Sequence, residues 1–227
     1  MSVWAHELKT PLTVVQSYLE ILTTDLDEGL SDEQLSFLRI TKESVFKLRR
    51  LVLDLVDLIG FRSGHLSVET STVDIASLLN EVVHEMLPLA QTAEVELIHE
   101  RPAVRVAIRA DADRVRQILR NLIDNAFKFT PPGGQITIRT RVERDWVIVD
   151  IVDNGVGIHP ADVGRIFEEF VQLKQKTVRR RRRGSGLGLA ISQRIAEAHG
   201  GTIEVESEID QGSVFSIRLP REHEEIE

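Results

Sequence analysis

The chain has 227 residues, of which 42% are hydrophobic and 28% are charged, and it carries a formal net charge of −8. This balance is typical of a globular, mildly acidic protein and argues against nucleic acid as the main partner. Because cysteine is absent and no apolar run approaches the roughly 18 residues of a membrane helix, disulfide scaffolds, thiolate metal sites and a membrane segment in this chain are excluded.

The first predicted element is a helix over residues 5–26. Its apolar residues follow the steps of three and four of a heptad seam, and they are Ala5, Leu8, Leu12, Val15, Leu19, Leu22 and Leu26. Pro11 weakens this helix, because it removes a backbone hydrogen bond at a cost of about 3 kcal/mol. His6 and Glu7 precede this weak point, and Thr10 shares a helix face with His6. His6 is then either a surface histidine in a kinked helix or an outward-facing imidazole that is used for chemistry.

Residues 25–31 form a polar turn, and Ser31 with Gln34 is a capping-box pattern for a second helix over residues 32–59. The apolar stripe of this helix is wider than a two-helix seam and comprises Leu35, Leu38, Thr41, Val45, Leu48, Leu51, Val52, Leu55, Leu58 and Ile59. Two helices cannot bury so wide a stripe against each other. The hairpin is therefore predicted to form a four-helix bundle with a second copy, and the alternative is packing on the rest of its own chain.

Residues 60–71 are rich in glycine, serine and threonine, which indicates a domain boundary. We predict a helical hairpin domain over residues 1–62, a linker over 63–73, a second domain over 74–221 and a frayed, charged tail over 222–227. Asp74 is a suitable N-cap for the first helix of the second domain.

The second domain combines helical and strand patterns in an order typical of an α+β fold. Helices are predicted over residues 74–90, 111–129 and 186–199, and strands over 95–98, 104–108, 135–142, 146–152, 202–209 and 213–219. Because the strands come in hairpins and the helices are grouped, we expect a layer of helices on a mixed or antiparallel sheet rather than a doubly wound parallel fold.

Asn121 and Asn125 lie four residues apart on one face of the predicted helix over residues 111–129, and Lys128 follows on the same side. Amide oxygens are hard ligands and lysine neutralises phosphate, so these side chains suit a magnesium–phosphate group. Solvent-facing polar residues are the alternative explanation of the same pattern.

Two glycine-rich turns carry further chemistry. Asp153 ends an apolar strand, where a buried carboxylate can accept a hydrogen bond from an adenine amine, while Gly155 and Gly157 let the backbone turn closely around a base. The second turn, residues 184–189, opens a helix whose first N–H groups can bind phosphate. It is neither a P-loop nor a Rossmann fingerprint, because it lacks the Lys-Ser/Thr ending and follows no strand. Ordinary loops also use such glycines.

Lys174, Lys176 and the arginines at 179–183 place seven positive charges just before the second glycine-rich turn. We interpret this segment as a mobile lid whose cations reach the phosphates of a nucleotide, and most of the arginines equally fit a solvated loop. A nuclear-localisation or nucleic-acid interpretation of such a run has a high false-positive rate.

Taken in order, these segments resemble the catalytic core of the sensor histidine kinases of two-component systems. Residues 6–11 match the family's phosphoacceptor box, and residues 121–129 match its asparagine box. The first glycine box is matched by residues 153–157, the phenylalanine box by residues 167–170 and the second glycine box by residues 184–189. Gly212 and Ser213 stand where the family often has a last glycine-rich turn. Each box is weak evidence alone, whereas six in one order over residues 1 to about 220 are highly specific.

The resemblance implies a dimerising phosphotransfer hairpin followed by a two-layer α/β sandwich of the GHKL (Bergerat) type that binds ATP. It implies that Asn125 holds magnesium with the help of Asn121, that Lys128 contacts phosphate and that Asp153 recognises adenine. The nucleotide pocket would also involve Phe129, Gly155, Gly157, Ile158, Phe170, Gly184, Ser185, Gly186, Leu187, Gly188 and Leu189. Phe129 stands where many members have tyrosine, so a hydroxyl contact is absent there.

By the same resemblance, His6 attacks the γ-phosphorus of ATP, and the phosphoryl group then passes to an aspartate of a response regulator. An imidazole with an ordinary pKa of about 6.5 is largely neutral at pH 7 and can attack. Glu7 would accept or orient the proton on the other ring nitrogen. Thr10 resembles the residue that positions water for dephosphorylation of the regulator, and Pro11 is a candidate bend.

Two other functions fit parts of the pattern: a GHKL ATPase that uses hydrolysis to drive conformational change, and a non-catalytic dimeric scaffold that senses nucleotide. The hairpin with His6 argues against the first, and the presence of Glu7, Asn125 and Asp153 argues against the second. We expect this segment to be cytoplasmic, within a longer parent that is either membrane-anchored or soluble.

Overall fold

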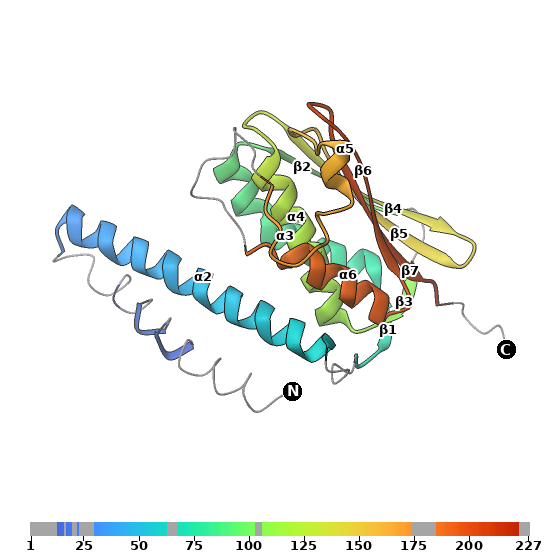
Figure 1. The fold of residues 1–227 in the computed structure, drawn as a ribbon, viewed down its shortest axis with the longest axis horizontal. Coiled ribbons are helices and arrows are strands. Elements are labelled where there is room, and N and C mark those ends of the chain that lie inside the picture. Colours follow the sequence, from blue (N-terminus) through green and yellow to red (C-terminus); the bar gives the residue numbers. More distant parts are fainter. Residues whose placement is uncertain are drawn as a thin grey trace. The chain divides into compact units, whose positions relative to one another are not determined.

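In the computed structural model of the protein, the described residues are 13–15, 17–19, 22, 30–62, 68–102, 106–173 and 185–222. They belong to two compact units, Met1–Ser67 and Val68–Glu227 (Figure 1). Within these ranges, no helix combines the length and the hydropathy needed to cross a membrane.

The first unit contains helix α2, Asp32–Arg62, which continues beyond the predicted end at residue 59. The predicted capping box is confirmed: the Ser31 N–H donates to Gln34 Oε1 over 2.8 Å, and the Gln34 N–H donates to Ser31 Oγ over 3.3 Å. Large apolar side chains remain exposed along this helix, namely Phe37, Ile40, Phe46, Leu48, Leu55 and Ile59.

The predicted first helix, over residues 5–26, is described only in part. Residues 13–15, 17–19 and 22 are helical, as predicted. The phosphoacceptor box at residues 6–11, with His6, Glu7 and Thr10, lies outside the described residues.

The second unit is built on a five-stranded mixed sheet. In spatial order its strands are β2 (Glu96–Glu100), β4 (Gln135–Glu143), β5 (Trp146–Asp153), β7 (Gly212–Pro220) and β6 (Thr202–Glu208). The β2–β4 pair is parallel and the other three pairs are antiparallel, which confirms the predicted mixed sheet. Two short strands, β1 (Ser71–Asp74) and β3 (Ala107–Ala110), form a separate antiparallel pair.

Helices cover one face of this sheet (Figure 1). They are α3 (Ile75–Ala93), α4 (Ala112–Phe129) and α6 (Gly188–Ala198), and a four-residue helix, α5 (Pro160–Val163), follows β5. Asp74 and Asp111 cap α3 and α4, because each carboxylate accepts two backbone N–H groups of the first turn. The result is a two-layer sandwich of helices on a sheet.

The core lies between these two layers. Alternate residues of the central strands point to the helices and are buried, including Ile136, Ile138, Val147, Val149, Ile151, Phe215, Ile217 and Leu219. Helix α4 contributes one apolar face, which consists of Val115, Ile118, Leu119, Leu122, Ile123 and Ala126, all less than 9% exposed. The spacing of these residues in the sequence is that of one face of a helix.

The opposite face of the sheet holds a buried carboxylate. Asp150 of β5 is fully buried because Arg139 and Arg141 of β4 cover it. Arg139 donates once, over 3.0 Å, whereas Arg141 donates through Nε over 2.7 Å and through Nη2 over 3.0 Å, and Ser216 Oγ donates over 2.7 Å. Burial raises the pKa of Asp150, but the hydrogen bonds from Arg141, Ser216 and Arg139 outweigh burial and lower that pKa below its usual value.

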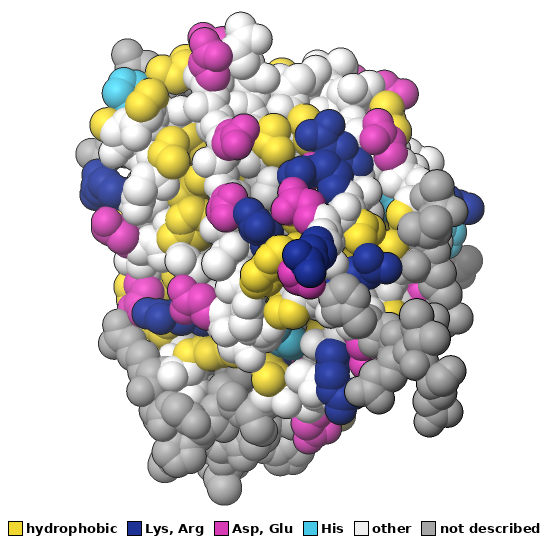
Figure 2. Space-filling view, turned by 90° about the vertical axis from the view of Figure 1, so that its right-hand side faces the viewer, with side chains coloured by type: hydrophobic (Ala, Val, Ile, Leu, Met, Phe, Trp, Pro, Cys, Tyr) yellow, Lys and Arg dark blue, Asp and Glu magenta, His cyan; other side chains and the backbone are white. Residues whose placement is uncertain are grey.

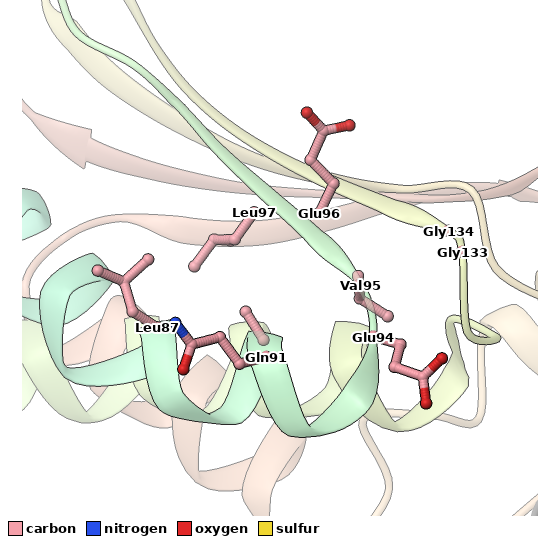
Figure 3. A pocket seen from close by; sticks show the side chains of 9 residues that line it. Leu87, Gln91, Glu94, Val95, Glu96, Leu97, Gly133 and Gly134 are labelled. Atoms are coloured by element: carbon pink, nitrogen blue, oxygen red, sulfur yellow. The ribbon is translucent and has the colours of Figure 1, made fainter.

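Charges of both signs are interspersed among the described residues on the face of the molecule that Figure 2 shows. In Figure 2, basic and acidic side chains lie among hydrophobic ones on one face, without a broad field of a single sign. A hollow of about 330 Å³ lies between α3 and β2, and in Figure 3 the side chains of Leu87 and Leu97 point into it, while the carboxylates of Glu94 and Glu96 point away. Among the residues that the structure describes, those predicted for the functional site do not line this hollow.

Three local predictions differ from the structure. Residues 71–73, assigned to the linker, form most of β1, and Val73 is buried there by pairing with β3. The strand predicted over 104–108 begins only at Ala107 in the described part of the chain. Helix α3 continues past the predicted end at residue 90 to Ala93, because Pro88 is accommodated inside it and Glu94 ends it in the left-handed conformation.

Candidate functional site

Asp153, at the end of β5, forms the centre of the first part of the site. Its side chain is 5% exposed and lies on the helical face of the sheet. The Gly155 N–H donates to its Oδ1 over 2.9 Å, and the Ser213 backbone N–H is a second donor. Burial raises the pKa of Asp153 to about 6, although the hydrogen bonds from the two backbone N–H groups act to lower that pKa. No ion pair within the described part of the chain includes this carboxylate.

The loop after Asp153 is fixed by two close backbone approaches. The Val156 N–H donates to the Phe129 carbonyl over 3.2 Å, which joins the loop to the end of α4. Gly157 has a φ of 65°, and a Cβ there would lie 2.0 Å from the Glu208 carbonyl oxygen. A larger residue at 157 would therefore push the loop away from the β6–β7 turn. Ile158, which the resemblance placed in the pocket, is buried just beyond this contact.

The asparagine face of α4 forms the second part of the site. Asn121 is 8% exposed, and its Nδ2 donates to Ser192 Oγ of α6 over 2.9 Å. A Cβ at Gly188 would lie 2.2 Å from Asn121 Oδ1, so glycine lets the first turn of α6 approach this amide. Asn121 therefore joins α4 to α6, and the solvent-facing alternative is wrong for this residue.

Asn125 and Lys128 lie further along α4, and both are half-buried. Lys128 Nζ lies 4.9 Å from the centre of the Phe129 ring, where a cation is attracted by the aromatic face. Since α4 also bears the Phe129 carbonyl that holds the Asp153 loop, this helix connects the two parts of the site.

The second glycine-rich turn leads into α6. The Phe170 N–H donates to the Gly186 carbonyl over 2.9 Å, and the Leu187 N–H donates to Ser185 Oγ over 3.1 Å. In the described part of the chain, no side-chain hydrogen bond caps α6 at its N-cap residue, Leu187. Its first N–H groups therefore suit an anionic ligand. Leu187 is buried and Leu189 is half-buried, whereas Gly184 and the basic run at 174–183 lie outside the described residues.

Three serines of the site were not predicted as site residues. Ser192 binds Asn121, Ser213 donates to Asp153, and Ser207 of β6 contacts Ser213 over 3.0 Å. Ser213 of β7 pairs with Asp153 of β5, although the two residues are 60 positions apart in the sequence. Local spacing carries no signal for such a contact; the only hint was the glycine-rich turn at Gly212.

Both parts of the chain match known family models. Residues 110–223 match the family model of the histidine kinase-, DNA gyrase B- and HSP90-like ATPases. The chain belongs to this ATPase family. Residues 1–59 match the model of the His Kinase A phospho-acceptor domain. With this domain in front of the ATPase-type domain, the chain is a histidine kinase catalytic core, and the predicted GHKL sandwich is confirmed.

Several relatives of this histidine kinase core are sensor proteins. It is 33% identical over 224 residues to the circadian input-output histidine kinase CikA of Synechococcus elongatus, covering 98% of this chain and 30% of that protein. It is 32% identical over 223 residues to the sensor histidine kinase WalK of Bacillus subtilis, covering 97% of this chain and 36% of that protein. The chain thus spans about a third of the length of these relatives.

Solved structures support the same architecture for the histidine kinase core. A crystal structure of full-length ShkA in complex with AMPPNP aligns with a TM-score of 0.78 at 32% identity, covering 97% of this chain and 45% of that chain. The Acinetobacter baumannii histidine kinase AdeS aligns with a TM-score of 0.65 at 25% identity, covering 96% of this chain and 98% of that chain.

Proposed function

We propose that the chain catalyses ATP-dependent phosphorylation of its own His6 and transfer of that phosphoryl group to an aspartate of a response regulator. The observation that carries this proposal is Asp153, a buried carboxylate at the end of a strand that faces α4, whose hydrogen-bond donors in the described part of the chain are backbone N–H groups. Such a group has acceptor capacity left for the amine of an adenine. The match of residues 1–59 to a phospho-acceptor domain supports a phosphoryl acceptor in the same chain.

The nucleotide would lie between the Asp153 loop and the first turn of α6. Asp153 would accept a hydrogen bond from the adenine amine, and the uncapped N–H groups at Gly188 and Leu189 would bind phosphate. The binding of AMPPNP by ShkA, to which this chain is similar over 97% of its length, supports an adenine nucleotide as the ligand.

Magnesium fits the donors on α4. The described residues contain no cluster of three or more histidine, aspartate or glutamate side chains that could hold a metal by themselves. A magnesium ion would therefore share the phosphates with one or two amide oxygens, and half-buried Asn125 supplies such an oxygen. Asn121 would assist mainly by holding α4 against α6, because its amide is buried against Ser192 and Gly188. When bound, magnesium would neutralise charge on the transferred phosphate.

In the proposed transfer, a ring nitrogen of His6 forms a bond to the γ-phosphorus of ATP. The bond from that phosphorus to the bridging oxygen breaks, and ADP leaves with the electron pair. Glu7 takes or orients the proton of the other ring nitrogen, and Lys128 stabilises charge on the phosphate oxygens. The nitrogen–phosphorus bond then breaks as an aspartate oxygen of the regulator attacks. Thr10 would position the water that later removes the phosphoryl group from the regulator.

The exposed apolar stripe on α2 supports a homodimer. Phe37, Leu48, Leu55 and Ile59 are each at least 45% exposed, which is unusual for large apolar side chains that recur at helical spacing. A second copy would cover them in a four-helix bundle. In light scattering, Leu48→Glu is expected to halve the measured mass. Val142→Glu, a change at an exposed apolar residue of β4, is expected to leave the mass unchanged.

Incubation with γ-labelled ATP and magnesium tests the transfer. We expect label that is lost in acid and kept in base, that disappears in His6→Gln and that persists in His84→Gln, a control at an exposed histidine of α3. Acid-stable label, or undiminished label in His6→Gln, would contradict the proposal. ATP hydrolysis without labelled protein would favour a simple ATPase, and binding without either reaction would favour a nucleotide-sensing scaffold. Label recovered by mixing His6→Gln with Asn125→Ala would show transfer across the dimer.

A further inference from the structure

Ser207 of β6 is a meeting point of three polar groups near Asp153. Its Oγ accepts a hydrogen bond from the Ile158 N–H over 2.8 Å and donates to the Gly212 carbonyl over 2.8 Å. It also lies 3.0 Å from the hydroxyl oxygen of Ser213. Ser207 is half-buried, and it uses its full hydrogen-bonding capacity on two segments of the chain, the loop after β5 and the start of β7.

The chemistry of these groups fixes the direction of each hydrogen bond. A hydroxyl has one hydrogen to donate, and the Gly212 carbonyl can only accept, so the hydrogen of Ser207 is used there. The hydrogen bond between the two serines must therefore be donated by Ser213. It follows that the Ser213 hydroxyl can act only as an acceptor toward any other group.

The same contacts join the two backbone segments around Asp153. Ser207 holds the loop after β5 through Ile158 and the β6–β7 turn through Gly212. The Asp210 N–H adds a second connection, because it donates to the Val156 carbonyl over 3.0 Å. The Ser213 backbone N–H in turn donates to the Asp153 carboxylate. A shift of Ser207 would thus move both sides of the carboxylate.

We propose that Ser207 is a positioning residue for base recognition: it holds the Asp153 loop on the β6–β7 turn and forces the Ser213 hydroxyl to be an acceptor. This inference rests on the proposed function, because it assumes that Asp153 faces the base. Asp153 and Ser213 are direct cross-strand partners on one face of the sheet. Two neighbouring acceptors favour a base with an exocyclic amino group, as in adenine, over one with a carbonyl oxygen at that place, as in guanine.

The test is calorimetric titration of the full chain with ATP, GTP and tripolyphosphate, each with magnesium. Ser207→Ala is expected to weaken ATP binding about tenfold, to change GTP binding far less, and to leave tripolyphosphate, which has no base, within about twofold. Ser207→Thr keeps the hydroxyl and is expected to restore the preference for ATP over GTP. Ser216→Ala is the matched control, since it removes a serine hydroxyl that donates to buried Asp150 on the other face of the same sheet.

The possible results distinguish a failure of the positioning role of Ser207 from a failure of the proposed function. Equal weakening of ATP and GTP by Ser207→Ala, or a loss no larger than that of Ser216→Ala, would overturn the positioning role and leave the proposed function intact. Absence of ATP binding by the unaltered chain would overturn the proposed function itself. If Ser207→Ala does not fold, Ser213→Ala replaces it, because it removes the oriented hydroxyl and leaves the bonds of Ser207 to Ile158 and Gly212 in place; an unchanged ratio of ATP to GTP affinity there would equally refute the inference.

Discussion

Asp150 and Asp153 lie on the same strand, three positions apart, and face opposite sides of the sheet. Both are buried, at 0% and 5% exposure. Asp150 is held by two arginines and a serine, and these hydrogen bonds lower its pKa despite burial. Among the described residues, the donors to Asp153 are backbone N–H groups, and burial raises its pKa to about 6.

The difference separates a structural carboxylate from one that suits a ligand. Arg139 and Arg141 provide the compensating charge for Asp150 within the protein, so that no external donor is needed. Asp153 has no such partner in the described part of the chain, and an incoming hydrogen-bond donor would relieve the cost of its burial. Burial alone does not distinguish the two residues; the chemistry of their neighbours does.

The largest expected effect is on nucleotide binding. Asp153→Asn should weaken ATP binding about 100-fold, because an amide is a poorer acceptor and can turn its own donor toward the adenine amine. Asp150→Asn should change the dissociation constant for ATP by less than about threefold, since it lies on the other face of the sheet. Calorimetric titration measures both dissociation constants, and similar losses of ATP affinity in the two variants would mean that the two carboxylates do not differ in ligand binding.

The opposite order is expected for stability. Asp150→Asn should lower the free energy of unfolding at pH 7 by about 2 kcal/mol, less than for a fully buried pair, because Arg139 and Arg141 are about half exposed and regain water. Asp153→Asn should leave stability unchanged or raise it, since a costly buried charge disappears. Urea denaturation followed by Trp146 fluorescence, in a Trp4→Phe background, monitors the second unit. A larger loss from Asp153→Asn would reverse the two roles.

The two carboxylates should also respond oppositely to pH. The raised pKa of Asp153 means that its contribution to stability is fully present below about 3.8 and is lost as the pH rises through about 6. The lowered pKa of Asp150 means that its contribution is present above about 3.8 and is lost as the pH falls through the lowered value. From pH 7 to pH 5, the unaltered chain should therefore gain about 1 kcal/mol in unfolding free energy relative to Asp153→Asn. Urea midpoints of both proteins at several pH values give this difference. If the difference in unfolding free energy between the two proteins did not change with pH, Asp153 would not titrate in this range.

The smallest expected effect compares the two arginines of the Asp150 cluster. Arg141 makes two hydrogen bonds to the carboxylate and Arg139 makes one. Arg141→Lys should cost about 1 kcal/mol of unfolding free energy, and Arg139→Lys less than about 0.5 kcal/mol, because lysine cannot reproduce a two-point contact. The same urea experiment measures both changes. Equal costs would mean that the second hydrogen bond of Arg141 contributes little.

Local patterns predicted much of this molecule. The helix over residues 111–129 and the caps at Ser31 and Asp74 were readable, because their signals are local in the sequence. Asp153 could be singled out since it ends an apolar strand and precedes a glycine-rich turn. Short elements escaped notice: β1 and α5 have four residues each, too few for a periodic pattern.

Contacts between distant segments could not be predicted from one sequence. Strand alternation places Asp150 on the outer face, where a charged residue is expected to be exposed, and its contacts with Arg139 and Arg141 of the neighbouring strand β4 explain why it is buried. Ser207 looks like any polar residue of an edge strand, yet its partner Ile158 is 49 positions away. Asn121 meets Ser192 across 71 positions.

The hydrogen bond from the Phe170 N–H to the Gly186 carbonyl has a consequence for how the chain tolerates insertions. It brings together the two ends of the stretch at 171–185, so the length of that stretch is set by neither the sheet nor α4. Lengthening a closed loop is inexpensive, at about 0.6 kcal/mol for each doubling. Insertions between residues 173 and 185 are therefore expected to cost little folding free energy.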